Sequence, residues 1–572
     1  MSLSRILAVF PLAGAVLLAQ LTMEQKVADF QYMASLYAKR YGPYEWKRDV
    51  VNFDLLNIGP WLTRINATRD DLQFFDVMSA YVSSLNDAHD VFTLPANFLA
   101  NLNFSVDVYD GALIVDSISR TRLPASEFPF LIGYELASID GVDAQKILDG
   151  LLRYEIAANP RSTRRLAAQL LTLRPQALIP TAANVPEIST VVFRRPDGVL
   201  ETYRIPWSRS GVPLTNVGRY PTWTGSSGSG LDEQEPSYTT LLRRLQNCRL
   251  PDRGYDRTVL GFGSRTPVFA SALTALGDGF TQRLGKVMSD TFYSGVFQNG
   301  PYKIGFIRIP DYAPSNPQMA MAQFKDEVAF FQANTDGLIV DEMRNPGGSV
   351  SYTNALLSLL IPYTWNSVGF EIRATSEWVL QISSAVEQAK TAGAPSYIIA
   401  LLQSLKGGIQ TANSENRGRT GPIPLDDVTI DRSPAMDKDG NVIAYTKPLM
   451  VLVDEMSASG GDYFPATIQD NARGPLFGFR TMGAGGNVEA WEAGSYSQGL
   501  TRVTESLMSR NIEVVTSDFP VTRYVENVGV RPDIEYDYMT RQNLMGGGAA
   551  FVTAFLQAMN NHIQSANGRP PQ

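Results

Sequence analysis

The sequence has few residues that bind metals or form disulfides, with one cysteine and two histidines among 572 residues. A single cysteine excludes an intramolecular disulfide and a cysteine-rich metal site, and we expect Cys248 to be chemically inert. Two histidines exclude a histidine-rich metal centre. A histidine base must therefore be His89 or His562, and His562 lies in a terminal segment typical of a fraying helix end.

Basic residues are not in excess over acidic residues. Lys and Arg number 49 against 57 for Asp and Glu, which gives a formal charge of −8. This balance argues against broad nucleic-acid binding and against docking on an anionic membrane. The hydrophobic fraction of 44% and the charged fraction of 19% are those of an ordinary globular protein. The length allows roughly three or four domains.

Long apolar runs are scarce. Arg5 precedes fourteen uncharged residues from Ile6 to Ala19, which is short of the ~20 residues that span a bilayer. The small residue Ala19 suits a cleavage site, so we expect a cleaved signal peptide at 1–19 and a secreted or periplasmic protein. A membrane anchor or a buried N-terminal helix is the alternative. No second stretch approaches this length, so we expect no stable membrane insertion after signal removal.

Two segments near the N-terminus have apolar residues at helical spacing, at 22–41 and 68–85, and predict a small helical domain. A β-rich stretch follows. Strands are predicted at 104–109 and 112–118 around an Asp-Gly turn, followed by a helix at 143–154 and strands at 190–193 and 201–205. This order, with the hydrophobic-Asp-Gly turn at 139–141, resembles a PDZ domain that carries an insertion at 155–185.

From residue 302 the pattern changes to alternating strands and helices. Continuous apolar strands at 337–341 and 449–453 are typical of a buried parallel sheet. Further predictions in this half are a strand at 302–309, a helix opened by Pro317, and helices at 351–361 and 377–405. Residues 207–236 upstream are rich in Ser, Gly, Pro and Thr, most densely at 224–230, and predict a linker or mobile loop.

Three segments of this half carry candidate chemistry. The strand at 338–341 runs into Arg344-Asn-Pro-Gly-Gly348, where consecutive glycines let backbone N–H groups approach a ligand. The strand at 449–453 runs into Ser457-Ala-Ser459, whose second serine would lie exposed at a helix N-terminus, a favourable position for a nucleophile. Glu526 precedes a Gly turn. Taken singly, these segments also fit an ordinary turn, a helix cap and a surface glutamate.

Together with Ile468-Gln-Asp470, Thr481-Met-Gly-Ala-Gly-Gly486 and Gly529-Val-Arg-Pro-Asp533, these segments resemble the tail-specific, C-terminal processing serine peptidases. The resemblance covers roughly 301–540 and implies a ClpP/crotonase-like α/β catalytic core. It assigns the nucleophile to Ser459. The bacterial enzymes place a lysine base where this sequence has Ala484, so a Ser–Lys dyad cannot operate.

One branch of the family uses a histidine from an N-terminal segment instead, and it includes the tricorn-core peptidases and the chlamydial protease-like activity factor. Leu85-Asn-Asp-Ala-His89 resembles that segment, and the order His89, Ser459, Glu526 fits the branch. Tricorn-type enzymes have a serine before the histidine. Because Ala88 stands there, the orienting network must differ, for example through a water or Asp87.

The resemblance implies an exported serine endopeptidase with a Ser-His-Glu mechanism. Ser459 would attack a peptide carbonyl, His89 would take its proton and Glu526 would orient the imidazole. The N–H of Gly460, with one from Gly347 or Gly348, would hold the oxyanion. No metal or cofactor is expected, the partners are polypeptide substrates, and homodimers occur in the branch.

Two other functions stay open. One is a catalytically inactive peptide- or ligand-binding member of the same fold, as the interphotoreceptor retinoid-binding protein resembles these peptidases. The other is a precursor whose loop around 207–250 blocks the cleft until it is cut.

The predicted domains are a signal peptide at 1–19, a helical domain carrying His89 at 20–97, the PDZ-like domain at 98–206, a connecting segment at 207–300, the α/β peptidase core at 301–545 and a C-terminal helix and tail at 546–572.

Overall fold

The computed structural model describes residues 20–215, 237–275 and 279–567. The predicted signal peptide and residues 216–236 of the predicted linker lie outside the described residues. The first part of that linker forms β10 (Ser208–Ser210), which pairs with β2 (Leu99–Asn101). Within the described ranges, no helix has both the length and the apolar character that a bilayer crossing requires.

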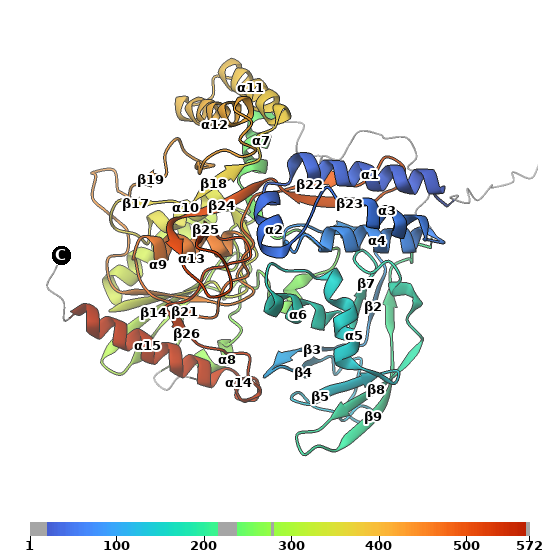
Figure 1. Cartoon of the computed structure of the whole chain (residues 1–572). Coiled ribbons are helices and arrows are strands. Elements are labelled where there is room, and N and C mark those ends of the chain that lie inside the picture. The colour runs from blue at the N-terminus through green and yellow to red at the C-terminus, as the bar shows by residue number, and fades with distance from the viewer. Residues whose placement is uncertain (1–19, 216–236, 276–278, 568–572) are drawn as a thin grey trace, which may run out of the picture.

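The N-terminal region is a group of helices that covers a strand pair from the far end of the chain (Figure 1). The predicted helices at 22–41 and 68–85 are present as α1 (Met23–Arg40) and α4 (Asp71–Ser83), whereas α2 (Tyr44–Val51) and α3 (Gly59–Asn66) were not predicted. Strand β1 (Phe92–Thr93) pairs with β23 (Leu500–Thr504), which pairs with β22 (Val488–Glu492). The segment that carries His89 is thus fixed to the C-terminal half directly after α4.

The β-rich region forms an antiparallel sheet of order β3-β4-β5-β8-β9, with β6 paired to β5. The predicted strands and the helix at 143–154 are confirmed, the helix being α5 (Ala144–Leu151) followed by a short 3-10 turn. The bounds are β3 Phe104–Tyr109, β4 Ala112–Ile118, β5 Glu135–Ile139, β6 Val142–Asp143, β8 Ile188–Arg194 and β9 Leu200–Pro206. Helix α6 (Pro160–Gln169) lies in the predicted insertion and contacts the C-terminal half through Ser162 and its N-cap residue Asn159.

The C-terminal half is built on a seven-stranded sheet of order β12-β13-β14-β15-β20-β21-β26, in which β14 to β26 run parallel. The predicted strands at 337–341 and 449–453 are confirmed as β15 (Gly337–Asp341) and β20 (Leu449–Val453). The other bounds are β12 Thr281–Gln282, β13 Tyr293–Asn299, β14 Tyr302–Arg308, β21 Leu476–Gly478 and β26 Ile534–Glu535.

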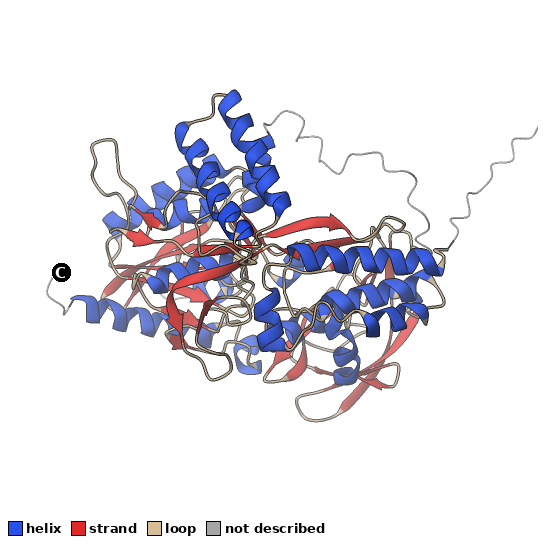
Figure 2. Ribbon diagram, turned by 45° about the horizontal axis from the view of Figure 1, so that its top comes forward, coloured by secondary structure: helices blue, strands red, loops and turns tan. Residues whose placement is uncertain are grey.

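Helices pack on both faces of this sheet, as Figure 2 shows. Along β15, Leu338 and Val340 join the core with α9 (Pro317–Asn334), α10 (Val350–Ser358) and α13 (Gly460–Asp470), while Ile339 joins the opposite core with α15 (Ala549–Asn567). Because successive strand residues face opposite sides, an unbroken apolar run is what a sheet buried on both faces requires. The turn with Gly347 and Gly348 follows the carboxyl end of β15, and the turn with Ser459 follows that of β20.

The prediction of one helix over 377–405 was wrong. The structure has a helical hairpin of α11 (Ser376–Thr391) and α12 (Ser396–Ser414) that projects from the core. The break has a local cause. Gly393 adopts a φ of +66°, which favours glycine, and Pro395 lacks the N–H needed to continue the first helix.

Candidate active site

The turn after β20 places Ser459 at the start of α13 in a strained backbone conformation, with φ 62° and ψ −111°. Asp462 holds this turn, because its carboxylate accepts hydrogen bonds from the N–H of Ser459 (2.8 Å) and of Ala484 (2.9 Å) and from the Thr481 hydroxyl. The turn that carries a lysine in the bacterial enzymes is therefore fixed to the nucleophile turn. Ser457 has a different role, as its hydroxyl donates to the Glu342 carbonyl at 3.0 Å.

The structure brings His89 and Ser459 together across 370 residues of sequence. The His89 Nε2 atom lies 2.7 Å from the Ser459 hydroxyl oxygen. The His89 loop is fixed from two directions, since Asp87 accepts from the His89 N–H at 2.9 Å and from the Tyr41 hydroxyl at 2.9 Å. A serine hydroxyl within hydrogen-bond reach of an imidazole is the arrangement required for general-base activation of a nucleophile.

Glu526 lies near His89 but makes no direct hydrogen bond to it. One Glu526 carboxylate oxygen accepts from the Lys47 ammonium and the other accepts from the Gly485 N–H at 2.8 Å. Within the described part of the chain, the His89 Nδ1 atom has no hydrogen-bond partner, and the Asp87 carboxylate lies 3.9 Å from it. The expectation that Glu526 orients the imidazole therefore requires an intermediary such as a water.

Lys47 is a site residue that the sequence reasoning missed. It lies on the unpredicted helix α2, in Tyr44-Glu-Trp-Lys-Arg-Asp-Val-Val51, where a lysine among charged neighbours is normally a surface residue. Its side chain is fully buried against the equally buried Glu526. Nothing in the local sequence distinguishes Lys47, because its partners come from positions 86, 526 and 527.

Burial controls the electrostatics of the site. Desolvation lowers the pKa of His89 to about 4; the Asp87 carboxylate opposes this shift, and Lys47 and Arg253 add to it. Burial and the Asp87 carboxylate raise the pKa of Glu526, and the Lys47 ammonium counteracts the rise. Burial, followed by Asp87, also raises the pKa of Asp90 well above its ordinary value. The imidazole is therefore neutral, as a proton acceptor must be, throughout the neutral range.

This shift predicts a pH effect on stability. The unfolded chain takes up a proton at His89 near pH 6.5, whereas the folded chain takes it up only near pH 4. The stability linked to His89 is therefore complete above pH 6.5 and is lost as the pH falls toward 4, by roughly 3 kcal/mol at ~1.4 kcal/mol per pH unit. Urea unfolding of the parent, His89→Gln and His562→Gln between pH 7 and 4.5 measures this. His89→Gln should flatten the slope and His562→Gln should keep it; equal slopes for the parent and His89→Gln would contradict the shift.

Donor atoms of Asp87, His89 and Glu526 all lie within 4.8 Å of one another, which is a spacing that suits a metal ion. The charge already present there disfavours one. The Lys47 ammonium lies against the Glu526 carboxylate, so a cation would have to displace it or accept its repulsion.

The two predicted oxyanion glycines of the first turn are not equivalent. The N–H of Gly347 donates to the Asn345 side chain at 2.8 Å. Gly348 lies opposite Cys248 in the antiparallel ladder with 247–249, so its N–H could serve an oxyanion only after leaving the Cys248 carbonyl. Strand β16 (Gly347–Ser349) lies close to the start of α13, since a Cβ atom on Gly460 would be 3.0 Å from the Gly348 nitrogen. The N–H groups of Gly348 and Gly460 thus lie near one another beside Ser459.

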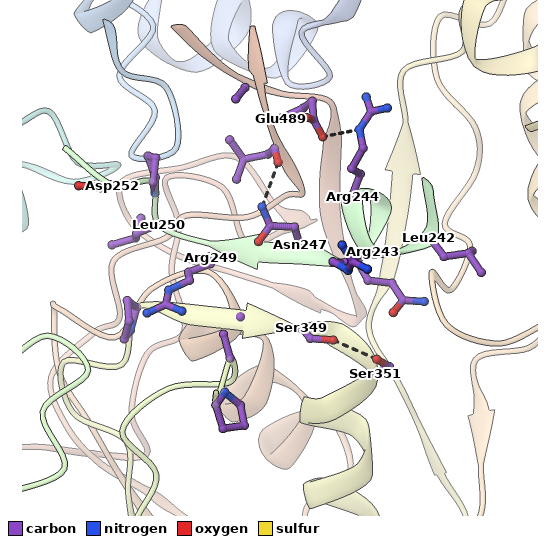
Figure 3. Close-up of a pocket in the computed structure, with 18 of the residues that line it drawn as sticks. Leu242, Arg243, Arg244, Asn247, Arg249, Leu250, Asp252, Ser349, Ser351 and Glu489 are labelled. Atoms are coloured by element: carbon purple, nitrogen blue, oxygen red, sulfur yellow. Dashed lines mark hydrogen bonds and ion pairs between the residues drawn. The ribbon is translucent and has the colours of Figure 1, made fainter. Parts of the chain in front are cut away.

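A cleft of about 1340 Å³ runs along the same turn (Figure 3). It lies between β22, α7 (Ser237–Leu245) and β11 (Asn247–Arg249), which pairs antiparallel with β16 and sets Cys248 opposite Gly348. Figure 3 shows Ser349 and Ser351 joined on one side and Arg244 paired with Glu489 on the other. This size and its position beside the Gly-Gly turn suit an extended polypeptide.

The nucleophile itself is covered in this structure. Ser459 and His89 are fully buried and neither lines the cleft. Their neighbours Ala458 and Ala88 pack in one cluster with Leu250, Phe262 and Met482. A substrate can therefore reach Ser459 only after side chains of this cover move.

Comparisons with known proteins agree with this architecture. Residues 303–536 match the model of peptidase family S41, and residues 99–214 match a PDZ domain model. A Chlamydia pneumoniae protein is 25% identical over 91% of this chain and 87% of its own length, and a Chlamydia trachomatis protein is 26% identical over 91% and 89%. The structures of mature CPAF, alone and complexed with lactacystin, are both 23% identical with TM-scores of 0.70 and 0.69. They cover 96% and 95% of this chain, and the match includes 99% of each of those chains.

These matches confirm the multidomain α/β fold with a PDZ domain and a peptidase core, and the resemblance to the processing peptidases drawn from the sequence.

Proposed function

Since this chain is a serine peptidase with a family S41 domain, we propose that it is an endopeptidase in which Ser459, His89 and Glu526 form the catalytic group. One observation carries the proposal, the 2.7 Å contact between His89 Nε2 and the Ser459 hydroxyl. Other features support it: the strained nucleophile turn at a helix N-terminus, the neighbouring N–H groups of Gly348 and Gly460, and the buried carboxylate beside His89.

The first half of the reaction forms an acyl-enzyme. The Ser459 oxygen attacks the scissile carbonyl carbon while His89 Nε2 accepts the hydroxyl proton. The N–H of Gly460 donates to the resulting oxyanion, and the Gly348 N–H can join it if it leaves the Cys248 carbonyl opposite it. As the tetrahedral intermediate collapses, the C–N bond breaks, and the imidazolium returns its proton to the departing amine.

The second half repeats these steps with water. His89 removes a proton from a water molecule, which attacks the ester carbonyl, and the intermediate expels the Ser459 oxygen as His89 protonates it. Glu526 stabilises the imidazolium in both halves through its negative charge. Because its carboxylate makes no direct hydrogen bond to His89, this stabilisation acts across a short gap or through a bound water.

We propose export for this protein, on the signal-like residues 1–19. Its partners would then be polypeptides outside the cytoplasm, and a homodimer is proposed by resemblance to the His-dependent branch. The burial of Ser459 favours a resting form that opens before it acts. A non-catalytic binding protein of the same fold is the competing function.

Labelling with a fluorophosphonate probe tests the proposal, since the probe reacts only with an activated serine. The parent, intact and after limited proteolysis, is compared with Ser459→Ala, His89→Ala and Ser457→Ala. We expect labelling of the parent and of Ser457→Ala, and none of Ser459→Ala or His89→Ala. An unlabelled parent in both forms would favour the binding protein, and labelled His89→Ala would remove His89 as the base.

A further inference from the structure

Lys47 forms three hydrogen bonds that join the two catalytic loops. Its ammonium donates to the Glu526 carboxylate, to the Asn527 side-chain oxygen at 2.8 Å and to the Asn86 carbonyl at 2.8 Å. Asn86 lies three residues before His89, so one buried cation holds both the His89 loop and the Glu526 loop. All three ammonium hydrogens have acceptors.

The neighbouring residue of α2 strengthens the same connection. The Trp46 ring nitrogen donates to the Glu526 carbonyl at 3.0 Å and lies 3.2 Å from the Asn527 side-chain oxygen. Asn527 in turn donates to the Asn86 and Ala158 carbonyls. Helix α2 thus forms a support that positions the acid and base loops relative to one another.

This arrangement excludes Lys47 as the base that activates Ser459. A lysine base needs a neutral amine with a free lone pair, whereas this side chain directs all three hydrogens at acceptors, one of them a carboxylate. The hydroxyl of Ser459 has His89 as its partner. The function of Lys47 must therefore be exerted through other residues.

The stability of the protein alone does not explain a buried ion pair, because removing two charges from water costs several kcal/mol per ion before their attraction is counted. A well-packed apolar pair in the same space would often be as stable. The site contains further negative charge, since the Asp87 carboxylate raises the pKa of Glu526 and Glu526 in turn helps to raise the pKa of Asp90. Without a cation, a fully buried Glu526 would take up a proton and lose its charge.

We propose that Lys47 is a positioning residue that keeps Glu526 ionised and holds it beside His89. This inference rests on the proposed catalytic group. Removal of Lys47 would leave the Glu526 carboxylate facing Asp87 and Asp90 on the His89 loop and the His89 ring itself. Among the described residues, the Gly485 N–H would remain as its hydrogen-bond donor. The remaining nearby cation, Arg253, lies among the groups that act on His89.

The test compares Lys47→Met, Glu526→Gln and the double variant, with kcat/KM against pH and thermal unfolding as measurements. We expect Lys47→Met to lose at least about tenfold in kcat/KM at pH 7 and to recover part of it at higher pH, because Glu526 then ionises only there. Glu526→Gln should lose activity without such a recovery. The double variant should match Glu526→Gln, because Lys47 acts through that carboxylate.

A matched control is Lys26→Met. Lys26 is a buried lysine on α1 whose ammonium lies 3.4 Å from Asp71. Its loss should lower stability but leave the pH profile unchanged. If Lys47→Met is too unstable to purify, the double variant tests the proposal, because replacing both partners leaves no unpaired buried charge.

The failures are distinguishable. An inactive, unlabelled parent overturns the proposed function itself, and full activity of Glu526→Gln overturns only the role of its carboxylate. If Glu526→Gln is impaired while Lys47→Met keeps the parental pH profile, or if the two losses multiply in the double variant, the inference about Lys47 is wrong.

Discussion

Replacing Ser459 with alanine is expected to lower kcat for a cleavable peptide by about 10⁵- to 10⁶-fold. The hydroxyl is the only group that forms the acyl-enzyme in the proposed mechanism, so its loss leaves catalysis by substrate positioning and oxyanion donors alone. The Ser459 side chain is small, and its hydroxyl makes one side-chain contact that the mechanism needs, to His89. Stability should therefore change little. Turnover of a fluorogenic peptide by the purified protein measures the effect.

The same assay applied to His89→Ala and to the double variant separates a working pair from two independent residues. Because Ser459 and His89 act as a unit, each single change should cost nearly as much as both together. Losses that multiply in the double variant would show that His89 contributes without activating Ser459. Ser457→Ala is the neighbouring control, and near-parental turnover is expected from it since the hydroxyl that it removes bonds to Asp454 within the turn and to the Glu342 carbonyl.

The contact between His89 and Ser459 could be anticipated because histidine is scarce. With two histidines in the chain and Ala484 in place of the family's lysine, only His89 had a suitable context. The buried strands β15 and β20 could be predicted equally well, because Leu338-Ile-Val340 and the five apolar residues 449–453 are the unbroken apolar runs that a sheet buried on both faces requires. Both predictions rely on patterns that are local in sequence.

The parts that could not be predicted depend on contacts between distant segments. The role of Lys47 depends on its contact with Glu526, which lies 479 residues away in the sequence. The hydrogen bond from the Gly347 N–H to the Asn345 side chain depends on the backbone path of the turn, so the Gly-Gly pattern could not predict it. Gly393 and Pro395 are local signals for the break between α11 and α12, but the helical spacing of apolar residues on either side favours one continuous helix.

Replacing Gly347 with alanine is expected to lower kcat by about 10²- to 10³-fold, because displacement of the neighbouring Gly460 N–H would remove one oxyanion donor. Gly347 has a φ of +88°, and an added Cβ atom would lie 2.5 Å from the Gly460 nitrogen and 2.8 Å from the Ser459 Cβ atom. It would also lie 2.2 Å from the Cys248 carbonyl oxygen. The backbone must shift, and the first atoms displaced are those that hold the nucleophile and the oxyanion.

Unfolding of the variant would also lower activity. The control is therefore a glycine at which an added Cβ atom would contact no other atom. Gly407 in the interior of α12 has no heavy atom within 4 Å of an added Cβ, and Gly407→Ala should be stabilised by roughly 0.5–1 kcal/mol with parental turnover. The measurement is kcat per folded molecule, with the unfolding midpoint recorded for each variant. A folded Gly347→Ala within about threefold of the parent would mean that the close approach of the two turns has no part in catalysis. A large loss of kcat with little change in KM would place the effect in the transition state, since oxyanion donors act on a charge that the bound substrate does not yet carry.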